Sequence, residues 1–168
     1  SISFDPNNKA HIAFQGVDGE IIYTKQNSTG AWNEKIVDNA SSFSDPSIVV
    51  DAYGNPHITY IDIPTKVQKY ATGFSENWQA YNLSNETDFS TTTAIELSKT
   101  GDLHTALLNS SGVPYHSLIQ YPDSDSDGIS ELRDLCPSEG NPNYDIDRDG
   151  CLDDFDNDGV YDYQDLCP

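Results

Sequence analysis

The stretch Ser47-Ile-Val-Val-Asp51-Ala-Tyr-Gly54-Asn-Pro-His57-Ile-Thr-Tyr60 decides how most of this chain folds. Two runs rich in β-branched and aromatic residues flank a turn that contains glycine, a pattern typical of adjacent antiparallel strands. Matching residues occur at 1–14 and 94–107, so the unit repeats after 46 and then 47 residues. The first 121 residues therefore form an internal repeat.

A period in the forties with four short strands per unit is typical of a β-propeller blade. In the second unit, residues 47–93, we expect strands near 46–51, 56–62, 66–72 and 77–83, and no helix of useful length. The first unit spans residues 1–46. The third unit, residues 94–121, has strands near 94–98, 103–108 and 113–119 and lacks a fourth. The sequence predicts an all-β fold of partial β-propeller-like repeats, with about 2.5 four-stranded blades over residues 1–121.

Such a set of blades cannot close a ring, because a propeller needs four to eight blades to protect its edges. We therefore expect the chain to be a fragment in which residues before Ser1 supply the missing strand of the third unit. A self-contained β-sandwich of about ten strands is the competing interpretation. Completion by neighbouring chains through exposed strand edges is a third.

Repeats of the form Val-Asp-x-x-Gly-x-Pro-His-Ile-x-Tyr, as at 50–60, are similar to those of microbial extracellular propellers. They resemble sialidase-type propellers only loosely. The sialidase motif Ser-x-Asp-x-Gly-x-x-Trp is not matched, because Ser28-Thr-Gly30-Ala-Trp32 lacks both the aspartate and the spacing. The resemblance brings no catalytic residue with it.

Histidine recurs at the same place in every unit, as His11, His57 and His104. Equivalent positions on successive blades lie too far apart to share one metal ion. We interpret these residues as structural histidines that form hydrogen bonds between blades. Trp32 and Trp78 also recur, and we expect them to be packing residues; a rim aromatic that binds a glycan is the alternative.

Beyond the repeats, the segment 123–168 places an acidic residue at nearly every second position. In Asp123-Ser-Asp-Ser-Asp-Gly-Ile-Ser-Glu-Leu-Arg-Asp134, carboxylates occupy positions 1, 3, 5, 9 and 12 and glycine occupies position 6. This is a calcium-loop pattern, because a hard cation takes six to eight oxygens and the chain must turn sharply around it. The pattern recurs from Asp145 and from Asp154, and these two loops overlap at Asp156, which can bridge two ions.

The acidic loops resemble thrombospondin type 3 repeats, the calcium-wrapped modules of extracellular matrix proteins. The resemblance rests on Asp-x-Asp-x-Asp-Gly-x-x-Glu-x-x-Asp-x-Cys-Pro at 123–137, on Cys-Pro-x-x-x-Asn-Pro at 136–142 and on a similar motif at 154–168. It covers the last quarter or so of the chain. Cys151 departs from the family pattern by lying at loop position 7, and the spacing from Gly150 to Gly159 is short, so the ion count stays open. An acidic disordered tail and a single helix-loop-helix calcium sensor are the alternatives.

The resemblance implies calcium ligands in each loop, namely the acidic side chains and the backbone carbonyl at position 7. The predicted side-chain ligands are Asp123, Asp125, Asp127, Glu131, Asp134, Asp145, Asp147, Asp149, Asp153, Asp154, Asp156, Asp158, Asp162 and Asp165, and the predicted carbonyl ligands are those of Ile129, Cys151 and Val160.

The three cysteines Cys136, Cys151 and Cys167 all lie beside these loops, which favours an oxidising compartment. We expect a Cys136–Cys151 disulfide, whose loop of about fifteen residues is worth roughly 3 kcal/mol. Cys167 then pairs with a cysteine beyond the given sequence or joins another chain; we favour the first, because the repeat appears cut off.

Acidic residues outnumber basic ones by 28 to 8, which excludes nucleic-acid binding. The imbalance is uneven: residues 1–121 carry 13 acidic and 6 basic side chains (net −7), and residues 122–168 carry 15 and 2 (net −13).

Five predicted N-glycosylation sites all lie in the β-repeats, with polar turns as the alternative interpretation. They are Asn27, Asn39, Asn82, Asn85 and Asn109. The sequence has no signal peptide, transmembrane run or lipidation motif and opens directly in a strand-like sequence, which favours truncation or maturation over a cytosolic origin.

No nucleophile with a base partner, phosphate loop or zinc spacing stands out, and no arginine precedes Arg133. We therefore expect a non-enzymatic extracellular or cell-surface structural or adhesion protein with a calcium-stabilised stalk, whose partners are glycans or surface and matrix proteins. One alternative is a subunit of an extracellular fibre or surface layer that assembles through exposed β edges. A fragment of a secreted propeller-type glycan-active enzyme is another, and it rests on architecture alone.

Overall fold

The structure, a computed structural model, describes residues 1–39, 42, 44–74 and 77–166. Cys167, whose partner the sequence left open, lies outside the described residues. The chain divides into two compact units, one of residues 1–97 and 103–119 and the other of residues 98–102 and 120–168. The described residues form strands and turns without a helix, which confirms the all-β prediction.

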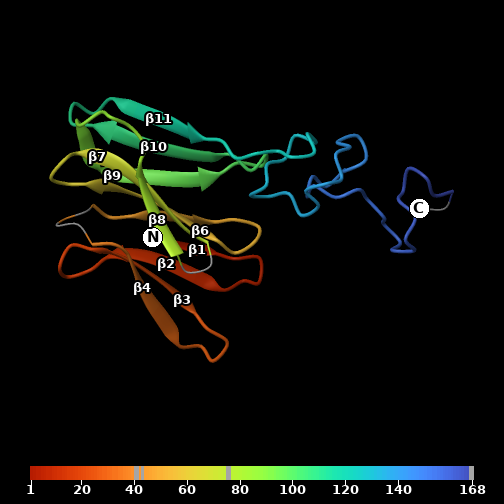
Figure 1. The fold of residues 1–168 in the computed structure, drawn as a ribbon, viewed down its shortest axis with the longest axis horizontal. Coiled ribbons are helices and arrows are strands. Elements are labelled where there is room, and N and C mark those ends of the chain that lie inside the picture. Colours follow the sequence, from red (N-terminus) through yellow and green to blue (C-terminus); the bar gives the residue numbers. More distant parts are fainter. Residues whose placement is uncertain (40–41, 43, 75–76, 167–168) are drawn as a thin grey trace. The chain divides into compact units, whose positions relative to one another are not determined.

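The first unit contains three antiparallel sheets in which strands that follow one another in the chain are hydrogen-bonded (Figure 1). The first sheet has β1 (Ile2–Phe4), β2 (Ala10–Gln15), β3 (Ile21–Gln26) and β4 (Trp32–Asp38). The second has β5 (Ser47–Val50), β6 (Pro56–Asp62), β7 (Val67–Phe74) and β8 (Asn77–Asn82), and the third has β9 (Phe89–Leu97), β10 (Leu103–Asn109) and β11 (Pro114–Ile119). None of these sheets closes on itself. The strands expected in the second and third sequence repeats are present, but β9 begins at Phe89, before the expected start near residue 94.

The three sequence repeats also share a backbone hydrogen bond at equivalent positions. The turn after the first strand of each sheet closes through an N–H that donates to the carbonyl four residues later, in Asp5 to Lys9 (3.0 Å), Asp51 to Asn55 (3.0 Å) and Ser98 to Asp102 (2.8 Å). The fourth residue of these turns has a positive φ, 58° at Asn8 and 82° at both Gly54 and Gly101. Glycine and asparagine adopt this conformation most readily, which explains the Gly-Asn-Pro-His signature.

The repeated histidines form hydrogen bonds within their own sheets, whereas we expected bonds between blades. His11 and His57 are fully buried. Nε2 of His11 donates to Asp5 (3.4 Å) and Nδ1 accepts from the hydroxyl of Tyr23 (2.8 Å). His57 repeats this arrangement with Asp51 (3.4 Å) and Tyr70 (2.6 Å). In the third sheet, His104 instead contacts His116 (Nδ1 to Nε2, 2.9 Å).

Apolar side chains fill the space between neighbouring sheets. Ile21 and Val37 of the first sheet pack with Ile58 and Tyr60 of the second, and Trp78 packs against this cluster. Phe89 and Leu107 of the third sheet pack with Ile61 of the second. The packing role predicted for Trp78 is therefore confirmed, whereas Trp32 lies on an edge strand and is 44% exposed.

A serine hydroxyl joins each sheet to the next at equivalent positions. Ser1 Oγ accepts the N–H of Ile48 (3.4 Å), and Ser47 Oγ accepts the N–H of Ile95 (3.2 Å). Consecutive sheets are therefore linked through residues at equivalent positions of the repeat.

Candidate metal sites

Three clusters of aspartates gather in the second unit, and each uses positions 1, 3 and 5 of one predicted calcium loop. Within each cluster, one carboxylate oxygen per residue lies within 4.8 Å of the others. The clusters are Asp123, Asp125 and Asp127; Asp145, Asp147 and Asp149; and Asp154, Asp156 and Asp158. The structure thus places Asp156, the residue shared by two predicted loops, in the third cluster.

The first aspartate of each loop accepts hydrogen bonds from the backbone of its own loop. Its carboxylate accepts the N–H of the glycine five residues later, at 3.1 Å for Asp123 and Gly128. The distances are 3.0 Å for Asp145 and Gly150 and 2.9 Å for Asp154 and Gly159. Each of these glycines has a φ between 89° and 95°, so the predicted sharp turn at position 6 is confirmed.

The fifth position of each loop repeats a second contact. Asp127 accepts the N–H of Ile129 (2.7 Å), Asp149 that of Cys151 (2.9 Å) and Asp158 that of Val160 (2.8 Å). These three N–H groups belong to the residues whose carbonyls we predicted as ligands. The N–H bonds hold position 7 against the carboxylate cluster in all three loops.

A backbone hydrogen bond closes each loop at position 9. The N–H of Glu131 donates to Pro122 (2.9 Å), that of Asp153 to Tyr144 (3.0 Å) and that of Asp162 to Asp153 (2.9 Å). The acceptor in every case is the carbonyl just before the first aspartate. The side chains at position 9 differ in their hydrogen bonds. Asp153 and Asp162 accept the backbone N–H groups of Ile146 (2.6 Å) and Phe155 (2.9 Å), whereas Oε1 of Glu131 is buried without a donor.

In the first loop, carboxylate oxygens are buried without a hydrogen-bond donor. They are Oδ2 of Asp125, Oδ2 of Asp127 and Oε1 of Glu131. Burial raises the pKa of Asp127; the hydrogen bond from Ile129 opposes this, and the charge of Asp125 adds to it. Buried anionic oxygens need a compensating partner. A cation that prefers oxygen ligands meets this need, so the first loop fits a calcium ion.

Asp134, at position 12 of the first loop, lies between the first two loops. It is fully buried and accepts the N–H of Cys136 (2.8 Å). Burial, together with the charges of Asp125, Asp127 and Glu131, raises its pKa to about 6. The backbone of Gly150 packs against it so closely that a Cβ on this glycine would lie 2.1 Å from Oδ1. Asp134 therefore interacts electrostatically with the first aspartate cluster and packs against the backbone of the second loop.

Covalent and backbone links also join the first two loops. Cys136 and Cys151 form the predicted disulfide across 15 residues. The N–H of Leu135 donates to the carbonyl of Asp149 (2.9 Å). The third loop is more open, since Asp156 and Asp158 are exposed. The third loop nevertheless ends with the same backbone hydrogen bond as the first. The N–H of Asp165 donates to the carbonyl of Tyr161 (3.0 Å), and in the first loop the N–H of Asp134 donates to the carbonyl of Ser130 (3.0 Å).

Residues 122–144 and 143–168 match the family model of the thrombospondin type 3 repeat. Type 3 repeats bind calcium and occur in extracellular proteins. The boundary between the two matches falls just before Asp145, so the first repeat holds one acidic loop and the second holds two. No curated protein matches the chain. Among the described residues, no helix is long and apolar enough to cross a membrane.

The predicted glycosylation sites differ in their surroundings. Asn39, Asn82 and Asn85 are exposed. Asn27 and Asn109 are half-buried, and each uses its side-chain oxygen to accept the N–H four residues later, of Ala31 (3.0 Å) and Val113 (2.8 Å). Glycosylation remains a prediction for all five.

Proposed function

We propose that this chain is a non-enzymatic extracellular or cell-surface protein with a structural or adhesive role, in which calcium stabilises the type 3 repeats. The observation that carries the proposal is the acidic loop built three times with the same hydrogen bonds. In the first copy, Asp125, Asp127 and Glu131 keep buried oxygens without a donor. Bound calcium supplies the positive charge that these carboxylates need.

The composition of the second unit explains why its folding would be coupled to ion binding. Its buried apolar side chains, among the described residues, are Ile129 and Leu132. Residues 122–168 carry a net charge of −13, which favours an open chain. Because the unfolded segment has no preformed site, the free energy of ion binding contributes directly to folding. The repeats would then act as a calcium-stabilised stalk.

The three sheets of the first unit would be blades of a β-propeller-like head. Two features support this: the strand order is the same in each sheet, and the hydroxyls of Ser1 and Ser47 link consecutive sheets in the same way. A propeller head presents turns and inter-blade clefts to partners, for which glycans or surface and matrix proteins are suitable.

A second candidate is a subunit of an extracellular fibre or surface layer. It is favoured by β4, an edge strand on which Trp32 and Ile36 are 44% and 60% exposed. Exposed, apolar edge strands pair readily with strands of other chains. Calcium-dependent oligomers in analytical ultracentrifugation would favour this candidate over a monomeric adhesion module.

Calcium titration of the chelator-treated chain by calorimetry, followed by circular dichroism, tests the proposed function. We expect about three ions, one for each cluster, with dissociation constants in the submillimolar to millimolar range of extracellular modules. Asp125→Asn with Asp127→Asn should remove one ion, whereas Asp18→Asn, an exposed acid of the first unit, should remove none. Absence of saturable binding would leave the acidic segment as a solvated tail and overturn the proposal.

A further inference from the structure

Each sheet of the first unit has one face that carries the repeated histidine, called here the histidine face, and one opposite face. Side chains alternate between the two faces along a strand, and directly paired residues share a face. Ala13 and Tyr23 therefore lie on the histidine face of the first sheet with His11. Ile58 lies on the opposite face of the second sheet, since it is adjacent to His57 on the same strand.

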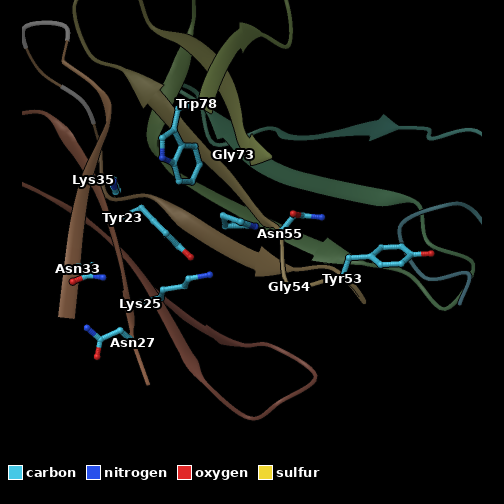
Figure 2. Close-up of a pocket in the computed structure, with 11 residues that line it drawn as sticks. Tyr23, Lys25, Asn27, Asn33, Lys35, Tyr53, Gly54, Asn55, Gly73 and Trp78 are labelled. Carbon is cyan, nitrogen blue, oxygen red and sulfur yellow. The ribbon is translucent and has the colours of Figure 1, made fainter. Parts of the chain in front are cut away.

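The first junction, between the first and second sheets, joins two unlike faces. Ala13 and Tyr23 pack with Ile58, so the histidine face of the first sheet contacts the opposite face of the second. Tyr23 and Trp78 line facing walls of the cavity at this junction (Figure 2). Their rings meet edge to face, with centroids 5.1 Å apart.

The second junction, between the second and third sheets, repeats this order. On the histidine face of the second sheet, Oγ1 of Thr59 contacts Oγ1 of Thr93 in the third (3.1 Å). Ile61, two residues after Thr59 on the same strand, packs with Leu107. Thr93 and Leu107 are paired across β9 and β10 and lie on the face opposite to His104. In the first two sheets, the histidine face is therefore covered by the opposite face of the next sheet.

The first sheet has an apolar opposite face that is exposed to solvent. On this face, Ile2 and Ile36 are 55% and 60% exposed, whereas Ile48, which occupies the position of Ile2 in the second sheet, is 5% exposed. Trp32 is likewise 44% exposed, whereas Trp78 at the same position of the second sheet packs against the core. Large exposed apolar patches mark surfaces that bind a partner.

The third sheet exposes its histidine face. Leu108 and Leu118 lie on this face and are each 45% exposed, and Ala106 between them in the sheet is exposed as well. His104 contacts His116 (2.9 Å) at the place where the two covered histidine faces have a histidine–tyrosine pair. The chain thus exposes one face of each kind, and the two kinds pack together at both of its internal junctions.

Polar contacts at the first junction indicate that these two exposed faces fit each other. There, Asp38 on the fourth strand of the first sheet accepts hydrogen bonds from Tyr60 (2.8 Å) and Lys69 (2.7 Å) of the second. The third sheet, as far as the structure describes it, has no fourth strand to supply such a carboxylate. The first sheet correspondingly has the apolar pair Phe14 and Ile22 at the positions of Tyr60 and Lys69. Its exposed face therefore needs no acid from the sheet that covers it.

We propose that a second copy of this chain covers both exposed faces, with the first sheet of each copy packed on the third sheet of the other. One copy has three sheets, and two copies have six, which is within the four to eight blades that close a propeller. The contact joins different surfaces of the two copies, and it closes when each copy uses both. The inference rests on the blade arrangement of the proposed function and assigns its head a partner, namely the chain itself.

Sedimentation velocity over a range of protein concentrations tests this dimer. All proteins carry Cys167→Ser, so that a disulfide between copies cannot imitate the association. We expect a species of twice the 18.5 kDa chain mass and no larger species as the concentration rises. Because both faces belong to the first unit, the dimer should persist after calcium is chelated, unlike the oligomers of the fibre candidate. A monomer at every concentration, or a mass that keeps rising, would overturn the proposal.

Charged substitutions on the two faces distinguish this contact from pairing along the edge of β4. Ile2→Glu and Leu108→Glu should each weaken dimerisation at least about tenfold, because each buries a carboxylate at the contact. Val17→Glu makes the same kind of change at a fully exposed turn between β2 and β3 and should have no effect. Equal weakening by Val17→Glu would contradict the assignment.

A mixture of the two face variants tests whether the contact joins unlike faces. An Ile2→Glu copy keeps its third-sheet face and a Leu108→Glu copy keeps its first-sheet face, so one contact of the mixed pair joins two unaltered faces. We expect dimers to reappear in the mixture, which would also show that both variants are folded. Loss of the dimer in only one variant, or no recovery on mixing, would contradict the proposal.

Calcium titration of the same samples keeps the two proposals apart. Normal calcium binding by a chain that stays monomeric would overturn the dimer and leave the proposed function standing. A dimer that depends on Ile2 and Leu108, in a chain that binds no calcium, would support the dimer and overturn the calcium-stabilised role.

Discussion

Gly150 is subject to two constraints, of which the glycines at position 6 of the other two acidic loops share only one. Its φ of 91° is unfavourable for any residue with a Cβ, and the carboxylate and Cα of Asp134 occupy the space that a Cβ needs. Gly128 has a similar φ of 95° with no atom within 4 Å of the same position. The two glycines therefore separate the cost of backbone strain from that of close packing.

Gly150→Ala should destabilise the repeats more than Gly128→Ala. The strain in Gly128→Ala should cost about 1–2 kcal/mol, and Gly150→Ala adds the displacement of Asp134, whose Cα lies 2.9 Å from the added Cβ. Urea unfolding of the calcium-saturated variants, followed by far-UV circular dichroism, measures the difference. Equal losses in the two variants would mean that Asp134 does not pack against Gly150.

His11 should make the first unit sensitive to mild acid. Burial lowers the pKa of His11, although the hydrogen bond and charge of Asp5 oppose it. Since the folded pKa lies below the 6.5 of the unfolded chain, unfolded molecules take up a proton first, and stability falls as the pH drops below about 6.5. NMR titration of the imidazole should give a pKa below 6.5. His11→Gln should flatten part of the decline in unfolding free energy between about pH 6.5 and 5, and a steeper decline would contradict the assignment.

At the scale of strands and loops, local patterns were sufficient for prediction. For the second sequence repeat, residues 47–93, the sequence predicts strands at 46–51, 56–62, 66–72 and 77–83. Strands β5 to β8 match these within about two residues, because alternation and turn residues are local signals. The aspartate clusters were found for the same reason, since positions 1, 3 and 5 of a loop are brought together by that loop alone.

Contacts between distant elements were not predictable in this way. The hydrogen bonds between histidine and tyrosine leave only a weak trace in the sequence, since Tyr23 and Tyr70 follow His11 and His57 by 12 and 13 residues. A cavity in the first unit, lined by residues of the first two sheets that include Lys25, Lys35 and Trp78, has no such signal, because the packing of the two sheets creates it. The fit of Asp134 against Gly150 likewise depends on how one loop follows the next.

The Cys136–Cys151 disulfide should contribute to the second unit independently of calcium. It closes a loop of 15 residues, for which the chain-entropy estimate is about 3 kcal/mol. Cys136→Ser with Cys151→Ser, compared at saturating calcium with Cys167→Ser alone, should lower the unfolding free energy of the repeats by up to this amount. All proteins in the comparison carry Cys167→Ser, which prevents disulfide exchange. Equal stability of the double and control variants would show that the calcium loops order the segment without the covalent link.

At the scale of the whole molecule, two sources of stability coexist in one chain. The sheets of the first unit bury apolar side chains such as Ile58, Tyr60 and Leu103, all fully inaccessible to solvent. In the acidic repeats, large apolar side chains such as Ile146, Phe155 and Leu166 are more than 80% exposed. The first unit can therefore fold by hydrophobic burial, whereas the second depends on its carboxylates, backbone hydrogen bonds and disulfide.

Calcium removal should consequently open one unit and spare the other. Hydrogen exchange after chelation should accelerate across residues 123–166, while amides of β6 and β10 stay protected. The turn of residues 98–102 should follow the repeats, although it connects β9 and β10. Its Thr100 carbonyl accepts the N–H of Ser130 (2.8 Å), and its Ser98 carbonyl accepts from Arg133 (3.3 Å). The turn after β5, residues 51–55, is the matched control and should remain unchanged. Uniform acceleration over both turns and all sheets would mean that calcium stabilises the chain as a single cooperative structure.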